Sequence, residues 1–233
     1  MVAARRRTLE SGAFSPVADA LEALALETLG TGPGRAAGAG HAPRLALDAG
    51  CGEGWYTDRL RLALDPLALP VLGIDVSRPA IRAAARRHPA VGWAVASNRA
   101  PPVLAGAAPL VTSLFGFEAW EPWAALQAPG QHVLTAGAGP DHLVELRRLV
   151  YGTVRVRDAP RDGAPERAGY ALVDERRVRA VRAAASGIAA DALAMTPHAH
   201  RVPAARAALV AEALPEVDAL TLDVTLRVWR RAA

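Results

Sequence analysis

Leu45 to Thr57 has the sequence LALDAGCGEGWYT. A short apolar run is closed by Asp48, and an amphipathic segment, Trp55 to Leu64, follows three alternating glycines, Gly50, Gly52 and Gly54. Glycine permits positive φ and lets a ligand touch the main chain, and the next helix points its free N–H groups at the loop. The stretch therefore predicts a strand, a glycine loop and a helix around a small ligand.

A second apolar run, Val71 to Ile74, ends at Asp75, where doubly wound sheets bind a ribose diol. The pyrophosphate version of the loop reads G-x-G-x-x-G, whereas this loop reads G-x-G-x-G. Asp48 and Glu53 oppose a phosphate but tolerate a sulfonium and an amino group. The pattern therefore favours S-adenosylmethionine (SAM) over NAD and over a turn without a ligand.

Apolar runs of strand type alternate, along most of the chain, with segments whose apolar residues recur at helical spacing. Further strands are expected at 91–96, 110–117, 128–139, 170–174 and 219–230, the last at a sheet edge. Helices are expected at 6–13, 16–29, 81–87, 188–193 and 203–214. Loops are expected at 30–42 and 155–169. This alternation predicts an α/β fold with a Rossmann-like, doubly wound, mostly parallel sheet.

Four segments together resemble the large-subunit ribosomal RNA guanine-N1 methyltransferases. They are LDAGCGEGWYT, GIDVSRPAIRAAARRHPAVGWAVAS (73–97), GPDHLVELRRLVYG (139–152) and LAMTPHAHR (193–201). The first is common to many class I methyltransferases, whereas DHLVELRRLVY and MTP are more specific. The resemblance implies a SAM-dependent methyltransferase with a seven-stranded sheet. It also implies four parts: 1–42, a helical lead-in and Gly-rich loop; 43–152, the SAM-binding core; 153–202, a substrate-covering insertion; and 203–233, a helix and edge strand.

The glycine loop and the resemblance together predict the residues that contact SAM. They are Phe14, Asp48, Gly50, Gly52, Glu53, Gly54, Asp75, Val76, Ser97, Asn98 and His142. Three of these have a structural alternative. Phe14 could be a hydrophobic staple at a helix entry, Asn98 a turn residue, and His142, placed in the DHLVELRR helix, a capping or core residue.

The segment EAWEPW follows the fourth expected strand and carries Glu118, Trp120, Glu121 and Trp123. Two indoles and two carboxylates there predict a wall for a flat acceptor, with core packing of the tryptophans as the alternative. Phe14 and Met195 are further candidates for contact with the acceptor. A ring nitrogen needs a base to remove its proton, and the candidate bases are Glu118, Glu121, His198 and His200.

Composition limits the remaining choices. The 27 basic residues, all arginine, give a net charge of +4, which permits an anionic partner without requiring one. Cys51 is the single cysteine, so neither an intrachain disulfide nor the family's zinc ribbon is expected, and we expect no metal. We expect no membrane span and a cytoplasmic protein. The missing ribbon and the Trp-rich loop favour a small aromatic heterocycle, such as an indole or cyclic dipeptide of secondary metabolism, over 23S rRNA as acceptor.

Overall fold

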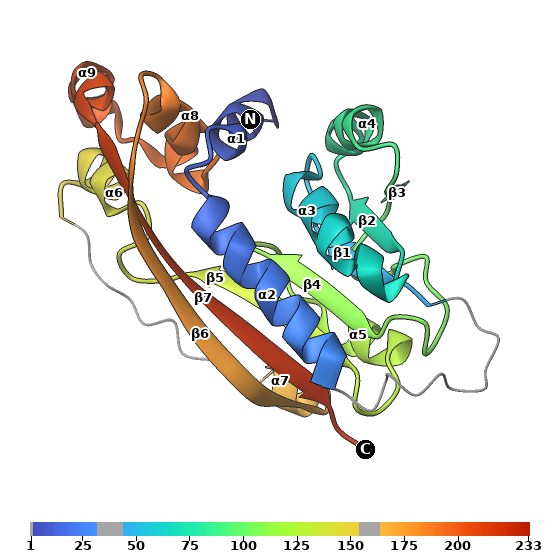
Figure 1. The fold of residues 1–233 in the computed structure, drawn as a ribbon. Coiled ribbons are helices and arrows are strands. Elements are labelled where there is room, and N and C mark those ends of the chain that lie inside the picture. The colour runs from blue at the N-terminus through green and yellow to red at the C-terminus, as the bar shows by residue number, and fades with distance from the viewer. Residues whose placement is uncertain (1, 32–43, 154–163) are drawn as a thin grey trace. The chain divides into compact units, whose positions relative to one another are not determined.

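The computed structural model describes residues 2–31, 44–153 and 164–233 (Figure 1). These residues form two compact units. One, the glycine-loop unit, comprises 18–31, 44–137, 164–176 and 226–233; the other, the His142 unit, comprises 2–17, 138–153 and 177–225. Most of the two expected loops, 30–42 and 155–169, lies outside the described residues. Among the described helices, none has the length and apolar character needed to cross a membrane.

The glycine-loop unit contains the elements expected around the ligand. Its helices are most of α2 (Ser15–Thr31), α3 (Trp55–Leu64), η2 (Asp65–Leu67), α4 (Arg78–Arg87), α5 (Trp120–Leu126) and α7 (Ala164–Arg167). Its strands are β1 (Ala46–Ala49), β2 (Val71–Asp75), β3 (Gly92–Val95), β4 (Leu110–Leu114), β5 (His132–Ala138) and parts of β6 (Tyr170–Ala183) and β7 (Ala219–Arg231). Helices α3 and α4 pack against β2, and α4 also packs against β3.

The His142 unit is mostly helical, and the rest of β6 and β7 runs into it. Its helices are α1 (Val2–Glu10), α6 (Val144–Tyr151), α8 (Ile188–Ala194), η3 (Pro197–Arg201), η4 (Ala204–Arg206), α9 (Ala207–Ala213) and η5 (Leu214–Glu216). The helix expected over 203–214 is therefore a 3-10 turn followed by the shorter α9. His142 precedes α6, which corrects its predicted place within that helix, because Leu143 has a positive φ of 50° and interrupts the helix there.

The seven strands form one sheet in the order β3-β2-β1-β4-β5-β7-β6, and the pairs from β3 to β5 are parallel. Strand β7 is antiparallel to β5, because Arg231 pairs with Gln131 at one end and Asp223 with Gly139 at the other. These features confirm the predicted Rossmann-like class I methyltransferase fold.

Strand β6 is the edge strand, which corrects the prediction that the terminal strand β7 occupies the edge. The sequence predicts only Tyr170 to Asp174 as a strand here, but β6 continues to Ala183. Its second half, ERRVRAVRA, is largely exposed and rich in arginine, so it lacks the apolar pattern that marks the inner strands. Strand β6 lies within the range 153–202 and belongs to the sheet.

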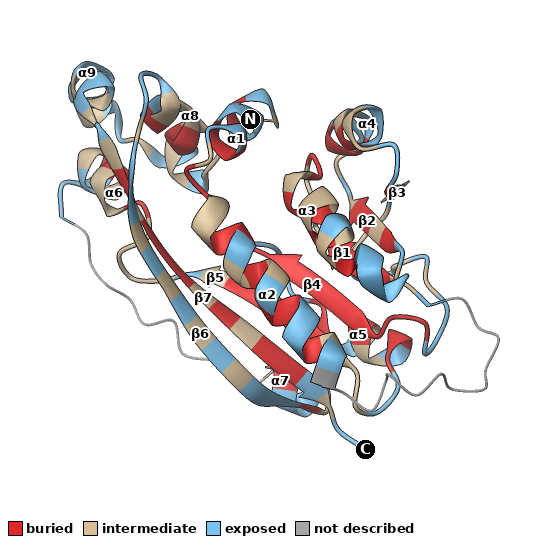
Figure 2. Ribbon diagram, in the orientation of Figure 1, coloured by how far each residue is buried: buried red, intermediate tan, exposed pale blue. Residues whose placement is uncertain are grey.

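An aromatic cluster in the core of the glycine-loop unit contains both tryptophans of EAWEPW. Trp123 is fully buried and Trp120 is 3% exposed. The Trp120 ring meets the rings of Trp123, Tyr170 and Trp229 edge to face, at centroid distances of 5.5, 5.4 and 5.3 Å. Figure 2 shows the buried residues gathered along the central strands. This burial favours core packing, the alternative, over the predicted acceptor wall of Trp120 and Trp123.

Replacing Trp123 with alanine should lower the free energy of unfolding by about 3–5 kcal/mol, because the change leaves a large cavity in a packed core. Trp123→Phe keeps a ring and should lose less. Urea unfolding measures both losses, and calorimetry on the folded fraction measures SAM affinity. Unchanged stability in Trp123→Ala together with a loss of turnover would restore the acceptor wall.

Candidate functional site

The carboxylate of Asp48 lies at the carboxyl end of β1 and is 2% exposed. Its Oδ2 accepts a hydrogen bond of 2.6 Å from the Thr57 hydroxyl on α3, and its Oδ1 accepts one of 2.9 Å from the Thr112 hydroxyl on β4. A buried carboxylate is costly unless such partners replace water. Asp48 therefore joins β1, α3 and β4 around the start of the glycine loop.

The glycine loop needs glycine for conformation and for space. Gly50, Gly52 and Gly54 have φ values of 86°, 61° and 89°, which L side chains rarely adopt. A Cβ on Gly54 would lie 2.4 Å from the Trp93 ring, and one on Gly73 of β2 would also lie 2.4 Å from it. Trp93 of β3 thus packs directly on two glycines. Trp93 is not among the residues predicted from the sequence. Two glycines, one in the loop and one on β2, with a tryptophan on the neighbouring strand could have indicated this packing.

Asp75 ends β2 and holds two backbone segments together. Its Oδ2 accepts from the Gly52 N–H at 2.9 Å, and its Oδ1 accepts from the Ser77 N–H at 2.7 Å. Each carboxylate oxygen has a second lone pair, so Asp75 can still accept hydrogen bonds from a ribose. Val76 follows at 72% exposure, which leaves an apolar side chain open beside the carboxylate.

The carboxyl ends of β3 and β4 are linked by Asn98. Its Nδ2 donates to the Phe117 carbonyl at 2.9 Å, and the same atom lies 3.6 Å from the place where a Cβ on Gly50 would be. Ser97 Oγ accepts from the Arg99 N–H at 3.2 Å. Asn98 therefore bonds to the segment after β4 and lies near Gly50, which follows β1.

The exit from β4 carries two features that the sequence reading missed. The Ser113 hydroxyl is buried and has no hydrogen-bond partner within the described residues. Phe115 has a positive φ of 56°, which is uncommon for a bulky residue and often marks a functional site. Neither feature has a distinctive sequence pattern.

Glu53 is part of the loop but its side chain is turned toward α4. It is 2% exposed, and its Oε2 accepts from Arg87 at 3.4 Å. The charge pair explains how a buried carboxylate is tolerated beside the glycines. The geometry favours a structural role for Glu53 over its predicted contact with SAM.

Phe14 and His142 lie in the His142 unit and pack against each other, with ring centroids 6.0 Å apart. The Asp223 N–H donates to His142 Nδ1 at 3.3 Å. Burial is the main cause that lowers the pKa of His142 to about 4, so the ring is neutral at pH 7. His142 can therefore act through hydrogen bonds and packing at that pH, and not as a cation.

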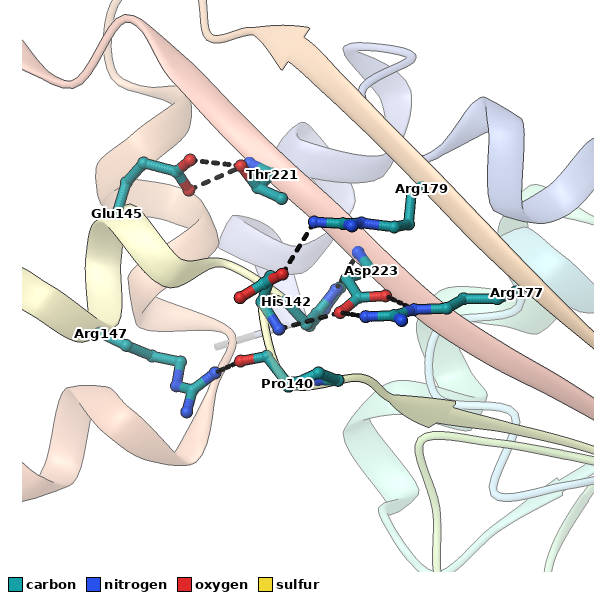
Figure 3. Close-up of polar contacts among 9 residues, drawn as sticks. Pro140, His142, Glu145, Arg147, Arg177, Arg179, Thr221 and Asp223 are labelled. Carbon is teal, nitrogen blue, oxygen red and sulfur yellow. Dashed lines mark hydrogen bonds and ion pairs between the residues drawn. The ribbon is translucent and has the colours of Figure 1, made fainter. Parts of the chain in front are cut away.

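A polar network surrounds His142 (Figure 3). The buried Asp223 carboxylate receives hydrogen bonds of 2.6 and 2.8 Å from Arg177, and Arg177 holds the pKa of Asp223 below its usual range. The Asp141 N–H also donates to Asp223 at 2.9 Å, and Arg179 pairs with the Asp141 carboxylate at 2.8 Å. The network fixes the turn that carries His142.

The remaining site candidates are divided between the two units. Glu118 and Glu121 are exposed and belong to the glycine-loop unit, where Trp120 Nε1 donates to Glu118 at 3.1 Å. His198 and His200 belong to the other unit, as does Met195, the C-terminal capping residue of α8.

His198 differs from the exposed His200 in having a close partner. The hydroxyl of Tyr151 lies 2.8 Å from His198 Nδ1, and burial is the main cause that lowers the pKa of His198. Within the described part of the chain, no three His, Cys, Asp or Glu side chains gather as a metal would require.

Comparison with known proteins agrees with this geometry. Residues 46–137 match the family model described as a methyltransferase domain. The chain is 32% identical over 234 aligned residues to the 23S rRNA (guanine(748)-N(1))-methyltransferase of Streptomyces fradiae, covering 99% of this chain and 79% of that protein.

Two solved structures share the fold at low identity. The YcgJ protein of Bacillus subtilis has a TM-score of 0.56 and 16% identity, over 82% of this chain and 93% of its own. A geranyl diphosphate methyltransferase in complex with SAM has a TM-score of 0.50 and 14% identity, over 91% and 85%.

The matches extend from the glycine loop over nearly the whole chain, and they agree with a loop built to receive SAM. The chain is therefore a SAM-dependent class I methyltransferase, and it belongs to the family that contains the 23S rRNA (guanine-N1)-methyltransferases.

Proposed function

We propose that this enzyme methylates N1 of a guanine in 23S rRNA. The observation that carries the proposal is the similarity to the Streptomyces fradiae 23S rRNA methyltransferase, which spans 99% of this chain. The specific segments DHLVELRRLVY and MTP lie outside residues 46–137, the part that matches the general methyltransferase model. They support a likeness that goes beyond binding of SAM.

This acceptor replaces the small aromatic heterocycle favoured by the sequence alone. That preference depended partly on an aromatic wall made by Trp120 and Trp123, and both side chains are buried in the core. The single cysteine still argues against a zinc ribbon, but similarity over 99% of the chain outweighs that ground for a small acceptor. The rRNA reading therefore has the stronger support.

SAM supplies the methyl group on a sulfonium, which is already a good leaving group. In the proposed site, Asp75 accepts hydrogen bonds from the ribose of SAM, and Val76 and Asn98 lie beside its adenine ring. The loop from Gly50 to Gly54 borders the methionine part, where its bare backbone permits close approach. Contact of Phe14 and His142 with SAM stays a prediction from the family resemblance.

The acceptor side needs a base, because guanine N1 carries a proton that must leave. Four side chains remain candidates for this role: Glu118, Glu121, His198 and His200. Trp120 orients the Glu118 carboxylate through its 3.1 Å hydrogen bond, directly after the exit from β4. This orientation makes Glu118 the first candidate to test.

Replacing Asp75 with alanine should weaken SAM binding by about 1.5–3 kcal/mol, roughly 10- to 150-fold, because hydrogen bonds to a charged group are lost. Isothermal calorimetry measures the change. Asp65→Ala, which removes an exposed carboxylate from η2, is the matched control and should bind normally. Equal affinity in Asp75→Ala and the wild type would remove Asp75 from the site.

Incubation with labelled SAM and protein-free 23S rRNA should methylate one guanine at N1, as mapped by nuclease digestion and mass spectrometry. Indoles, cyclic dipeptides and free purines should accept no methyl group. Each of the four candidate bases is replaced with glutamine in turn. The variant that lacks the base should have a kcat about 100-fold lower or more and an unchanged affinity for SAM. Methylation of a small heterocycle with no labelling of the RNA would contradict the proposal.

His142, which is partly buried, should make the fold sensitive to acid. Its folded pKa of about 4 lies below the usual 6.5, so the unfolded chain binds more protons between these values and stability falls as pH drops from 6.5 to 4. The full loss is about 3 kcal/mol. Urea unfolding at pH 7 and 4.5 should show a smaller difference for His142→Gln than for the wild type or for His200→Gln. The same difference in all three would mean that His142 is not buried in its neutral form.

A further inference from the structure

Helix α4 carries a row of arginines on its outer face. Arg78, Arg82 and Arg86 follow one another at intervals of four residues, and all three are exposed. The inner face, with Ala80, Ile81 and Ala84, is buried against the sheet. Residues four apart lie on one side of a helix, so the three guanidinium groups form a single stripe, the α4 stripe. Figure 2 shows exposed residues on α4 opposite its buried face.

The α4 stripe has no internal counter-charge. Within the residues that the structure describes, none of its three guanidinium groups forms an ion pair or a side-chain hydrogen bond. The nearby acids serve other groups: Glu53 pairs with Arg87, and Asp58 pairs with Arg61 and with His88 at 3.0 Å from each. The stripe is therefore available to an external anion.

This arrangement opposes helix stability. Like charges four residues apart are mutually repulsive, and Arg78 places a cation in the first turn, where the helix dipole favours an anion. Helix α4 has no acidic residue in that turn to compensate. Elsewhere in the chain, arginines such as Arg59 and Arg176 each contact two carboxylates. The α4 stripe departs from that pattern.

We propose that the α4 stripe binds the phosphate backbone of the RNA substrate next to the guanine that is methylated. The inference rests on the proposed function, since it assigns a contact surface to the same rRNA acceptor. Helix α4 begins directly after Asp75 and its capping residue Ser77, so the stripe starts beside the cofactor end of the sheet.

The length and chemistry of the stripe fit the phosphodiester backbone of a nucleic-acid strand. From Arg78 to Arg86 the helix rises about 12 Å, a length over which a nucleic-acid strand presents several phosphates. Guanidinium groups bind phosphate through paired hydrogen bonds. Such contacts position the RNA without reading its sequence, which leaves recognition of the target base to the active site.

The test compares two double variants that remove equal charge. Arg82→Gln with Arg86→Gln reduces the α4 stripe. Arg182→Gln with Arg230→Gln removes two exposed arginines of β6 and β7 that likewise form no ion pair within the described residues. Fluorescence anisotropy measures binding of a 23S rRNA fragment over a range of salt concentrations, and calorimetry measures SAM affinity as a check on folding.

In the stripe variant, RNA affinity should fall about tenfold or more at low salt. The slope of log affinity against log salt should become shallower by about 1.5, as expected for two lost phosphate contacts. The control variant should bind like the wild type, and all three proteins should bind SAM equally. The proposal would be overturned if the two variants bound RNA equally and with equal slopes. It would also be overturned if the wild type bound anionic vesicles but not RNA.

Methyl transfer by the wild type is read separately from RNA binding. If the wild type methylates the RNA but the two variants bind it alike, the α4 stripe is rejected and the proposed function stands. If the wild type binds RNA through the stripe but methylates none, the proposed function is rejected and the stripe remains an RNA-binding surface.

Discussion

The buried Asp48 carboxylate is the interaction on which the cofactor site depends. It accepts hydrogen bonds from Thr57 and Thr112, so one side chain fixes β1 against both α3 and β4. The loop between β1 and α3 can then adopt positive φ values while its N–H groups bond to the end of β2, where Ile74 and Asp75 accept them. Removing the Asp48 carboxylate would therefore loosen the glycine loop even if Asp48 itself makes no contact with the ligand.

A second constraint acts on the far side of the loop, where Trp93 fills the space left by two glycines. Gly54 is thus required by packing as well as by its φ. Within the loop, the charge of Glu53 is paired with that of Arg87, which favours a structural role for this side chain. We propose contact with SAM for the glycines of the loop and for Asp75, which ends β2.

The sequence predicted the parts of the fold whose signals are local. Strands β1 and β2 and helices α3 and α4 follow from apolar runs and glycines within a few positions. It could not predict the long β6 or the burial of Trp120, because both depend on strands far away in the chain. Partners of buried polar groups, such as Thr112 for Asp48, were missed for the same reason.

An experimental structure with S-adenosylhomocysteine bound tests most directly the central claim that this strand edge is the cofactor site. We expect ribose hydroxyls within hydrogen-bond distance of the Asp75 carboxylate and the homocysteine part beside Gly50 to Gly54, with Asp48 still bonded to its two threonines. Ligand bound away from Asp75, or a glycine loop rebuilt so that Asp48 loses both threonine hydrogen bonds, would contradict it.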